Sequence, residues 1–160
     1  MKLRGFIAED FVNYKIPSMF LASTTCDWKC CVEQGMSPTL CQNESLASSP
    51  IIDITDDSIY SLFSANDIAQ AVVIGGLEPI LQFDELDRLI STFRCYGEMC
   101  DFVIYTGYYP EEIQRETSIL ARHRNVIIKY GRYVPNRPPV YDEVLGITLA
   151  SDNQFARRIS

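Results

Sequence analysis

The sequence contains a single histidine, His123, and no apolar run of about 18 residues. Without such a run a membrane-spanning helix is excluded, and we expect no membrane partner. Its basic residues are scattered as far as the Arg157-Arg158 pair, and the net charge is −7. Because polynucleotide-binding surfaces gather lysine and arginine, we do not expect the chain to bind nucleic acid. No histidine or carboxylate dyad for acid–base catalysis is evident either.

Repeats, low-complexity tracts and linkers are absent too, so we predict a single domain over residues 1–160. Hydrophobic residues make up 47% of the chain, which is enough to bury a core. The N-terminal MKLRGFIAEDF has acidic residues where a secretory signal needs an apolar centre, so a cytoplasmic location is expected. In that reducing compartment, clustered cysteines favour metal or redox chemistry over disulfides.

Apolar runs and helical patterns alternate along the chain. We predict buried strands at 19–23, 69–76, 101–107 and 125–131, and helices at 54–67, 83–97 and 110–123. This alternation indicates an α/β fold with mainly parallel strands, covered on both faces. An eight-unit barrel takes about 200 residues or more, so we expect an open, partial βα barrel.

Ligands of parallel sheets bind where the strands end. The segments expected at that edge are the cysteine segment after the first predicted strand, GGLEP (75–79) and TGYYP (106–110). The unusual residues of the sequence therefore fall where a ligand site is expected.

Four of the six cysteines fall within TTCDWKCCVEQGMSPTLCQN (24–43), namely Cys26, Cys30, Cys31 and Cys41. Thiolates select zinc or iron–sulfur clusters. The C-x2-C pair common in structural zinc sites is absent, and His123 lies far along the chain. The residues alone allow two kinds of metal site. Either all four cysteines bind zinc, or fewer than four hold a cluster in which one iron has no protein ligand. Buried, inert cysteines are the third reading.

Several motifs resemble those of radical S-adenosylmethionine (SAM) enzymes. PSMFLASTTCDWKCC resembles their strand and C-x3-C-x2-C cysteine loop, and GGLEP resembles their GGEP motif with one residue inserted. Four further blocks are similar, in the same order, to those of the anaerobic ribonucleotide reductase activating proteins: CQN (41–43), VIYTGYYPEEI (103–113), GRYV (131–134) and SDNQFARRI (151–159).

This resemblance implies a [4Fe-4S] cluster held by Cys26, Cys30 and Cys41. The regular motif would put its third cysteine at position 33, which is Glu33, whereas Cys41 precedes the matching QN. Cys31 is the alternative third ligand. SAM would chelate the open iron through its amino and carboxylate groups. The reduced cluster would then cleave the SAM carbon–sulfur bond to a 5′-deoxyadenosyl radical, and no catalytic side chain beyond the cluster is implied.

The resemblance also implies how SAM is bound at the strand ends. Gly75 and Gly76 would bring backbone carbonyls to the SAM ammonium, with Glu78 supporting that contact. Thr106 would hydrogen-bond the SAM carboxylate or ribose.

Two residues of the cysteine segment complete this predicted SAM site. Leu40 would pack against the adenine, as the hydrophobic position of the family does. Asn43 would be a polar contact of the cofactor, although it is also a candidate cap for the next helix.

The function implied is activation of an anaerobic ribonucleotide reductase. The enzyme would generate a glycyl radical on the large reductase subunit, its protein substrate, and would receive electrons from a donor such as flavodoxin. A partial barrel would leave the radical site open toward such a substrate. The alternative is a non-catalytic zinc or iron–sulfur interaction or regulatory module on a degenerate radical SAM fold, which the irregular cysteine spacing favours.

Overall fold

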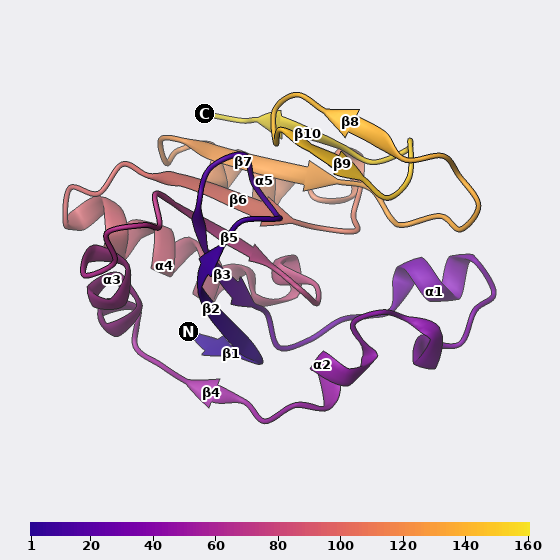
Figure 1. The fold of residues 1–160 in the computed structure, drawn as a ribbon, viewed down its shortest axis with the longest axis horizontal. Coiled ribbons are helices and arrows are strands. Elements are labelled where there is room, and N and C mark those ends of the chain that lie inside the picture. Colours follow the sequence, from indigo (N-terminus) through magenta and orange to yellow (C-terminus); the bar gives the residue numbers. More distant parts are fainter.

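A six-stranded mixed sheet forms the centre of the structure, a computed structural model that describes residues 1–160. Its strand order is β10-β7-β6-β5-β3-β2 (Figure 1). The four inner strands are parallel, and each pairs with the next in the chain: β3 (Ser18–Ala22), β5 (Ala71–Gly75), β6 (Asp101–Tyr105) and β7 (Val126–Tyr130). The two edges are antiparallel, β2 (Gly5–Asp10) beside β3 and β10 (Phe155–Arg158) beside β7.

Helices cover one face of this sheet (Figure 1). They are α3 (Asp56–Ser64), α4 (Phe83–Cys95) and α5 (Gln114–Leu120). Successive residues of a strand point to opposite faces, so in β5 Val72 and Ile74 join the core beneath the helices, while Ala71 and Val73 join the core on the other face. That second core is covered by Tyr14 and the hairpin of β8 (Val140–Asp142) and β9 (Ile147–Leu149).

Helix α4 shows why these sequences become helical. Its buried residues recur at helical spacing, and they are Leu86, Leu89, Ile90 and Phe93. Asp84 and Glu85 lie in the first turn, where the helix dipole favours negative charge. The helix ends just before Gly97, whose φ of 82° is left-handed and therefore suits glycine.

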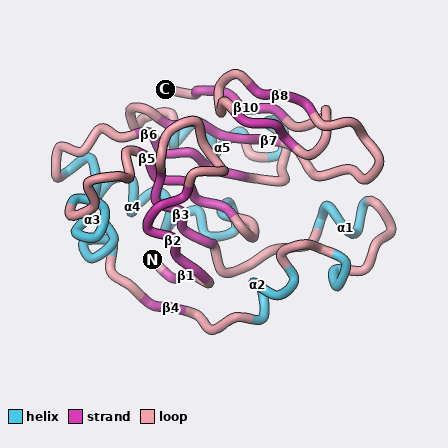
Figure 2. The backbone as a smooth tube through the Cα atoms, viewed as in Figure 1, coloured by secondary structure: helices cyan, strands magenta, loops and turns pink.

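The connection from β3 to β5 is long and contains several short elements (Figure 2). In chain order they are α1 (Lys29–Glu33), the 3-10 helix η1 (Pro38–Leu40), α2 (Glu44–Ser48) and β4 (Ile52–Asp53), before α3. Strand β4 pairs with β1 (Lys2–Leu3) in a separate two-stranded sheet. Two more 3-10 helices, η2 (Pro79–Gln82) and η3 (Pro110–Glu112), follow β5 and β6. The predicted cysteine loop is therefore partly helical.

The prediction of an α/β fold with mainly parallel strands is confirmed. The predicted helix at 110–123 is divided in the structure, because the Glu112 carboxylate accepts the Tyr109 backbone N–H and a 3-10 turn precedes α5. The sequence analysis missed the strands β1, β2, β4, β8, β9 and β10, which have short or mixed patterns. The sheet alone does not establish a radical SAM barrel. None of the helices combines the length and apolarity needed to cross a bilayer.

Phe93→Ala tests the core beneath the helices. Phe93 is fully buried and packs edge-on against Tyr60 and Phe102. Its truncation should lower the free energy of unfolding by about 3–5 kcal/mol, because it leaves a cavity in close-packed surroundings. Denaturant unfolding measures the change. The exposed Leu62 on α3 supplies the control, since Leu62→Ala should cost less than about 0.5 kcal/mol. Equal losses in the two variants would contradict the assigned core.

Candidate metal centre

The segments that follow the parallel strands meet at one edge of the sheet. Hydrogen bonds join them in pairs beyond the last ladder contacts. The Ser23 N–H donates to the Gly75 carbonyl at 2.9 Å, and the Glu78 N–H donates to the Thr25 carbonyl at 2.8 Å. The expected gathering of the cysteine segment and the GGLEP segment is therefore present.

Cys26 is the first cysteine after β3. Its sulfur accepts a hydrogen bond from the Trp28 backbone N–H at 3.3 Å. Trp28 has a left-handed φ of 59° and sits immediately before α1, the helix that carries Cys30 and Cys31. The chain thus turns sharply between its first and second cysteines.

Cys31 lies between two of the predicted ligands. It is 1% exposed, and its sulfur is 3.9 Å from that of Cys30. Cys41 follows η1, and its sulfur accepts the Asn43 backbone N–H at 3.5 Å. Burial raises the pKa of Cys41, the Asn43 hydrogen bond opposes this shift, and the adjacent Cys31 thiol adds to it. Cys31 therefore lies next to Cys30 and close enough to Cys41 to influence its protonation.

Cys26 and Cys30 also line a small cavity of about 30 Å³, together with Glu78, Tyr108 and Arg132 among others. No group of three or more histidine, cysteine or acidic side chains is close enough to hold a metal ion as placed. The assignment of Cys26, Cys30 and Cys41 as the ligands, with Cys31 as the alternative, thus stays a prediction.

Burial shifts the protonation of these thiols. It raises the pKa of Cys26 to about 11 and, together with the neighbouring Cys31 thiol, that of Cys30 to about 12. Both groups are protonated at neutral pH unless a cation is present. A metal ion favours the thiolate instead, so metal binding at this site would release protons.

The GGLEP turn contacts the cysteine segment directly. The Asn43 side-chain amide donates to the Gly76 carbonyl at 2.5 Å. Asn43 occupies the N-cap position of α2, but its side chain makes no capping bond there. Gly76 has a left-handed φ of 81°, and a Cβ at this position would lie 2.7 Å from Leu46 Cδ2 in α2. Glycine is therefore required by both conformation and space.

The carbonyls of Gly75 and Gly76 differ in their remaining capacity to accept hydrogen bonds. The Gly75 carbonyl already accepts hydrogen bonds from Ser23 through its backbone N–H and, at 3.1 Å, its hydroxyl. The Gly76 carbonyl accepts the Asn43 amide and could accept one more bond. Their predicted contact with an ammonium group stays a prediction.

Glu78 is a buried carboxylate that ties the end of β5 to the end of β6. It accepts the Thr106 hydroxyl at 2.7 Å, the Gly107 N–H at 2.9 Å and the Ile80 N–H at 3.1 Å. Burial raises the pKa of Glu78, and these three hydrogen bonds oppose that shift. Glu78 and Thr106 are thus hydrogen-bonded to each other within the protein. Their predicted roles toward SAM are untested by these contacts.

Leu40, in contrast, is 72% exposed on η1. It lies one residue before Cys41, as the sequence dictates, but packs in neither hydrophobic core. Its predicted contact with adenine stays a prediction.

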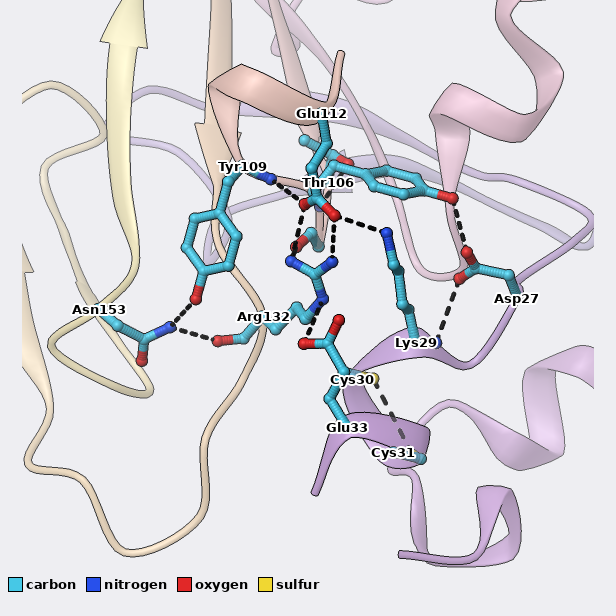
Figure 3. A network of polar contacts seen from close by, with 12 residues as sticks. Asp27, Lys29, Cys30, Cys31, Glu33, Thr106, Tyr109, Glu112, Arg132 and Asn153 are labelled. Carbon is cyan, nitrogen blue, oxygen red and sulfur yellow. Dashed lines mark hydrogen bonds and ion pairs between the residues drawn. The ribbon is translucent and has the colours of Figure 1, made fainter. Parts of the chain in front are cut away.

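A network of four charged side chains, which sequence reasoning missed, connects α1 to Glu112 in η3 and to Arg132 after β7 (Figure 3). We call Lys29, Glu33, Glu112 and Arg132 the charged network. Arg132 forms two hydrogen bonds with the Glu112 carboxylate, at 2.8 and 2.5 Å, and its Nε lies 2.9 Å from the Glu33 carboxylate. Lys29 donates to Glu112 at 2.5 Å. The sequence placed Glu112 only in the predicted helix at 110–123, and nothing in it linked this residue to Lys29, Glu33 or Arg132.

Lys129 was also missed, because it lies within the apolar pattern of a predicted strand. It is 7% exposed, and its ammonium donates to the Gly131 carbonyl at 2.9 Å. Burial lowers the pKa of Lys129 to about 8, although the charges of Glu78 and Cys30 act in the opposite direction. A buried cation therefore lies near the cysteine segment.

The sequence matches the family model described as "4Fe-4S single cluster domain" over residues 18–145, well over half of the chain. The chain belongs to this family. The matched range includes β3, the whole cysteine segment, β5, β6 and β7. No curated protein matches the chain.

The donor chemistry fits the cluster of this single-cluster family. Thiolates are the usual ligands of [4Fe-4S] clusters, and hydrogen bonds to their sulfurs tune the reduction potential. Cys26 and Cys41 each accept a backbone N–H from two residues further along the chain. Such bonds stabilise a sulfur that carries negative charge. The cluster-binding assignment of the family thus agrees with the environment of these two cysteines.

Gly76→Ala tests the close approach of the GGLEP turn to α2. A matched control is Gly97→Ala, because Gly97 has nearly the same φ of 82° but no atom within 4 Å of the added Cβ. The control should cost about 1–2 kcal/mol for the left-handed backbone alone. Gly76→Ala should cost a further ~1–3 kcal/mol because the methyl group overlaps Leu46. Denaturant unfolding measures both, and equal costs would refute this packing.

Glu112→Gln tests the charged network through pH. Hydrogen bonds from Arg132, followed by those from Lys29 and Tyr109, lower the pKa of Glu112 from its usual 4.5 to about 2. The folded protein thus binds this proton more weakly than the unfolded chain. The contribution of ionised Glu112 to the free energy of unfolding is complete above about pH 4.5 and is lost as the pH falls toward 2. The difference in unfolding free energy between wild type and Glu112→Gln should therefore shrink on acidification. A difference that does not change with pH would contradict the pairing, and Glu111→Gln is the control.

Proposed function

We propose that the chain is a radical SAM activating enzyme that generates a glycyl radical on an anaerobic ribonucleotide reductase. Its membership in a 4Fe-4S single cluster family supports the cofactor. The parallel sheet, with the cysteine segment at its carboxyl edge, supports a partial radical SAM barrel. We further propose that it works in the cytoplasm on the large reductase subunit, with a donor such as flavodoxin.

One observation carries this proposal. The GGLEP turn and the cysteine segment are joined by the hydrogen bond from Asn43 to the Gly76 carbonyl and by that from the Glu78 N–H to Thr25. A turn without side chains beside the metal suits a second ligand there, because backbone groups can approach that ligand closely.

The chain's own residues would bind and orient these groups. Cys26, Cys30 and Cys41 would hold the cluster, and it would supply the electron that cleaves SAM, the chemistry from which a glycyl radical is made. The Gly76 carbonyl, with one acceptor position left, would bind the SAM ammonium. Glu78 fixes the turn that presents it.

Thr106, Leu40 and Asn43 would complete the SAM site. Thr106 lies at the end of β6, and its hydroxyl donates to Glu78 and accepts the Tyr108 N–H. The exposed Leu40 would gain a partner by packing against adenine. Asn43 would hold the Gly76 carbonyl in place rather than contact SAM freely.

The second candidate is a non-catalytic zinc or iron–sulfur module. The position of Cys31 favours it, because its sulfur is adjacent to Cys30 and influences Cys41. Four thiolates satisfy the tetrahedral preference of zinc. The two candidates differ in whether one metal position stays open to SAM.

Anaerobic reconstitution with iron and sulfide tests the proposal. The wild type should become brown through sulfur-to-iron charge transfer and, when reduced with SAM, should form 5′-deoxyadenosine. Cys41→Ser should lose the cluster and this product, whereas Cys31→Ser should keep both. The exposed Cys95 supplies the control, since Cys95→Ser should behave as the wild type. Iron content, visible absorption and chromatography of the product are the measurements.

Other results would change the assignment. Cluster loss in Cys31→Ser but not in Cys41→Ser would make Cys31 the third ligand. Colourless wild-type protein that retains zinc, or a brown protein that never cleaves SAM, would support the non-catalytic module. A glycyl-radical signal after incubation with an anaerobic reductase would identify the protein substrate.

A further inference from the structure

Helix α1 carries Cys30 but has little apolar packing to fix its position. It is five residues long, and Cys31 is its only buried residue. Isolated helices of this length are not stable in water, so tertiary contacts must hold it. Hydrophobic burial of a single thiol is a weak and non-directional contact.

Charged contacts attach α1 at both ends instead. Lys29, at the start of the helix, donates to Glu112 at 2.5 Å, and Glu33, at its end, lies 2.9 Å from Arg132. Glu112 and Arg132 are themselves joined by two parallel hydrogen bonds. The helix is therefore connected through both ends to the same rigid pair (Figure 3).

Arg132 is well placed to transmit this constraint. It is 3% exposed, and it lies 5.0 Å from the centre of the Tyr109 ring. Its backbone carbonyl accepts the Asn153 amide at 2.7 Å. Its guanidinium cannot rotate without losing several contacts at once, and the planar fork fixes direction as well as distance.

The same pair lies beside the predicted ligands. Arg132 lines the small cavity that Cys26 and Cys30 also line. Lys29 is the residue immediately before Cys30, so its bond to Glu112 restrains the helix next to that cysteine. A shift of this pair would move Cys30 relative to the rest of the site.

We propose that Arg132 and Glu112 are positioning residues that hold the cysteine helix α1, and with it Cys30, at the cluster site. The inference rests on metal binding by the cysteine segment and does not require the SAM reaction. Neither residue is a ligand in this account. Each acts through α1, Glu112 on its first residue and Arg132 on its last.

The first test uses metal-free protein and the buried Cys31. Release of α1 should expose this thiol. Alkylation of Cys31 should therefore be roughly ten-fold faster in Glu112→Gln than in the wild type. This is the change expected when a charged hydrogen bond no longer opposes local opening of the helix. Mass spectrometry measures the modification at each cysteine, and the exposed Cys95 gives an internal reference rate. Glu111→Gln, the adjacent acid, is the matched control and should react as the wild type.

Arg132→Met and Glu33→Gln complete this test. Arg132→Met should expose Cys31 at least as much as Glu112→Gln. Glu33 is 44% exposed, so Glu33→Gln should leave the fold intact while removing one contact. Once Arg132 is replaced, the Glu33 substitution should have no further effect. Independent, additive effects of the two substitutions would overturn the proposal, because the residues would then not act through one contact.

The second test uses cluster-loaded protein. Loss of iron to a chelator should be about ten-fold faster in Glu112→Gln and Arg132→Met than in Glu111→Gln, a typical effect of removing partners that orient metal ligands. The midpoint potential should fall in Arg132→Met and rise in Glu112→Gln, because one loses a positive and the other a negative charge. Arg132→Lys should keep the wild-type potential.

Because the two variants change the charge in opposite directions, faster iron loss in both would show that the lost contacts, and not the altered charge, weaken cluster binding. Iron loss and Cys31 alkylation equal to those of Glu111→Gln would overturn the proposal. Faster alkylation in metal-free protein would support it even if no SAM cleavage were found, so the result is separate from that of the proposed function.

Discussion

Parallel pairing of four adjacent strands of the sheet is the constraint on which the site depends. Because β3, β5, β6 and β7 run in one direction, the segments after them emerge at a single edge. The strand order alone then brings residues that are far apart in the chain close together. Helices cover one face and the β8–β9 hairpin covers the other, and ligands of parallel sheets bind at the edge where the strands end.

Polar contacts, rather than apolar packing, organise that edge. Each strand ends in a turn whose backbone groups need partners when they are buried. Glu78 satisfies N–H groups from two turns with one carboxylate, and Asn43 satisfies the Gly76 carbonyl from the cysteine segment. Burial makes such bonds directional constraints, because leaving one unmade costs more than the bond itself contributes. These bonds therefore fix the turns at this edge without any ligand.

The sequence predicts those elements whose own periodicity reports burial. Helix α4 shows helical spacing, and strands β5, β6 and β7 are continuous apolar runs, so both kinds of pattern reported burial correctly. The cysteine segment was also identified, but its helix α1 was not, because five residues with one buried thiol show no period. The charged network left no local signal either. Lys29 and Glu112 are 83 residues apart, and only the fold brings them together.

The charges around the cysteines also have a thermodynamic consequence. The charged network contains two cations and two anions, so it can hold α1 without adding net charge. Lys129 differs, because its ammonium donates to a carbonyl and not to a carboxylate, and burial lowers the pKa of this lysine to about 8. Thiolates formed on metal binding would place negative charge near it and raise that pKa again. By linkage, a charged Lys129 then favours thiolate ligands to the same extent that they favour its proton. If the cysteines bind a metal, the buried lysine would offset part of the cost of gathering thiolates where the strands end.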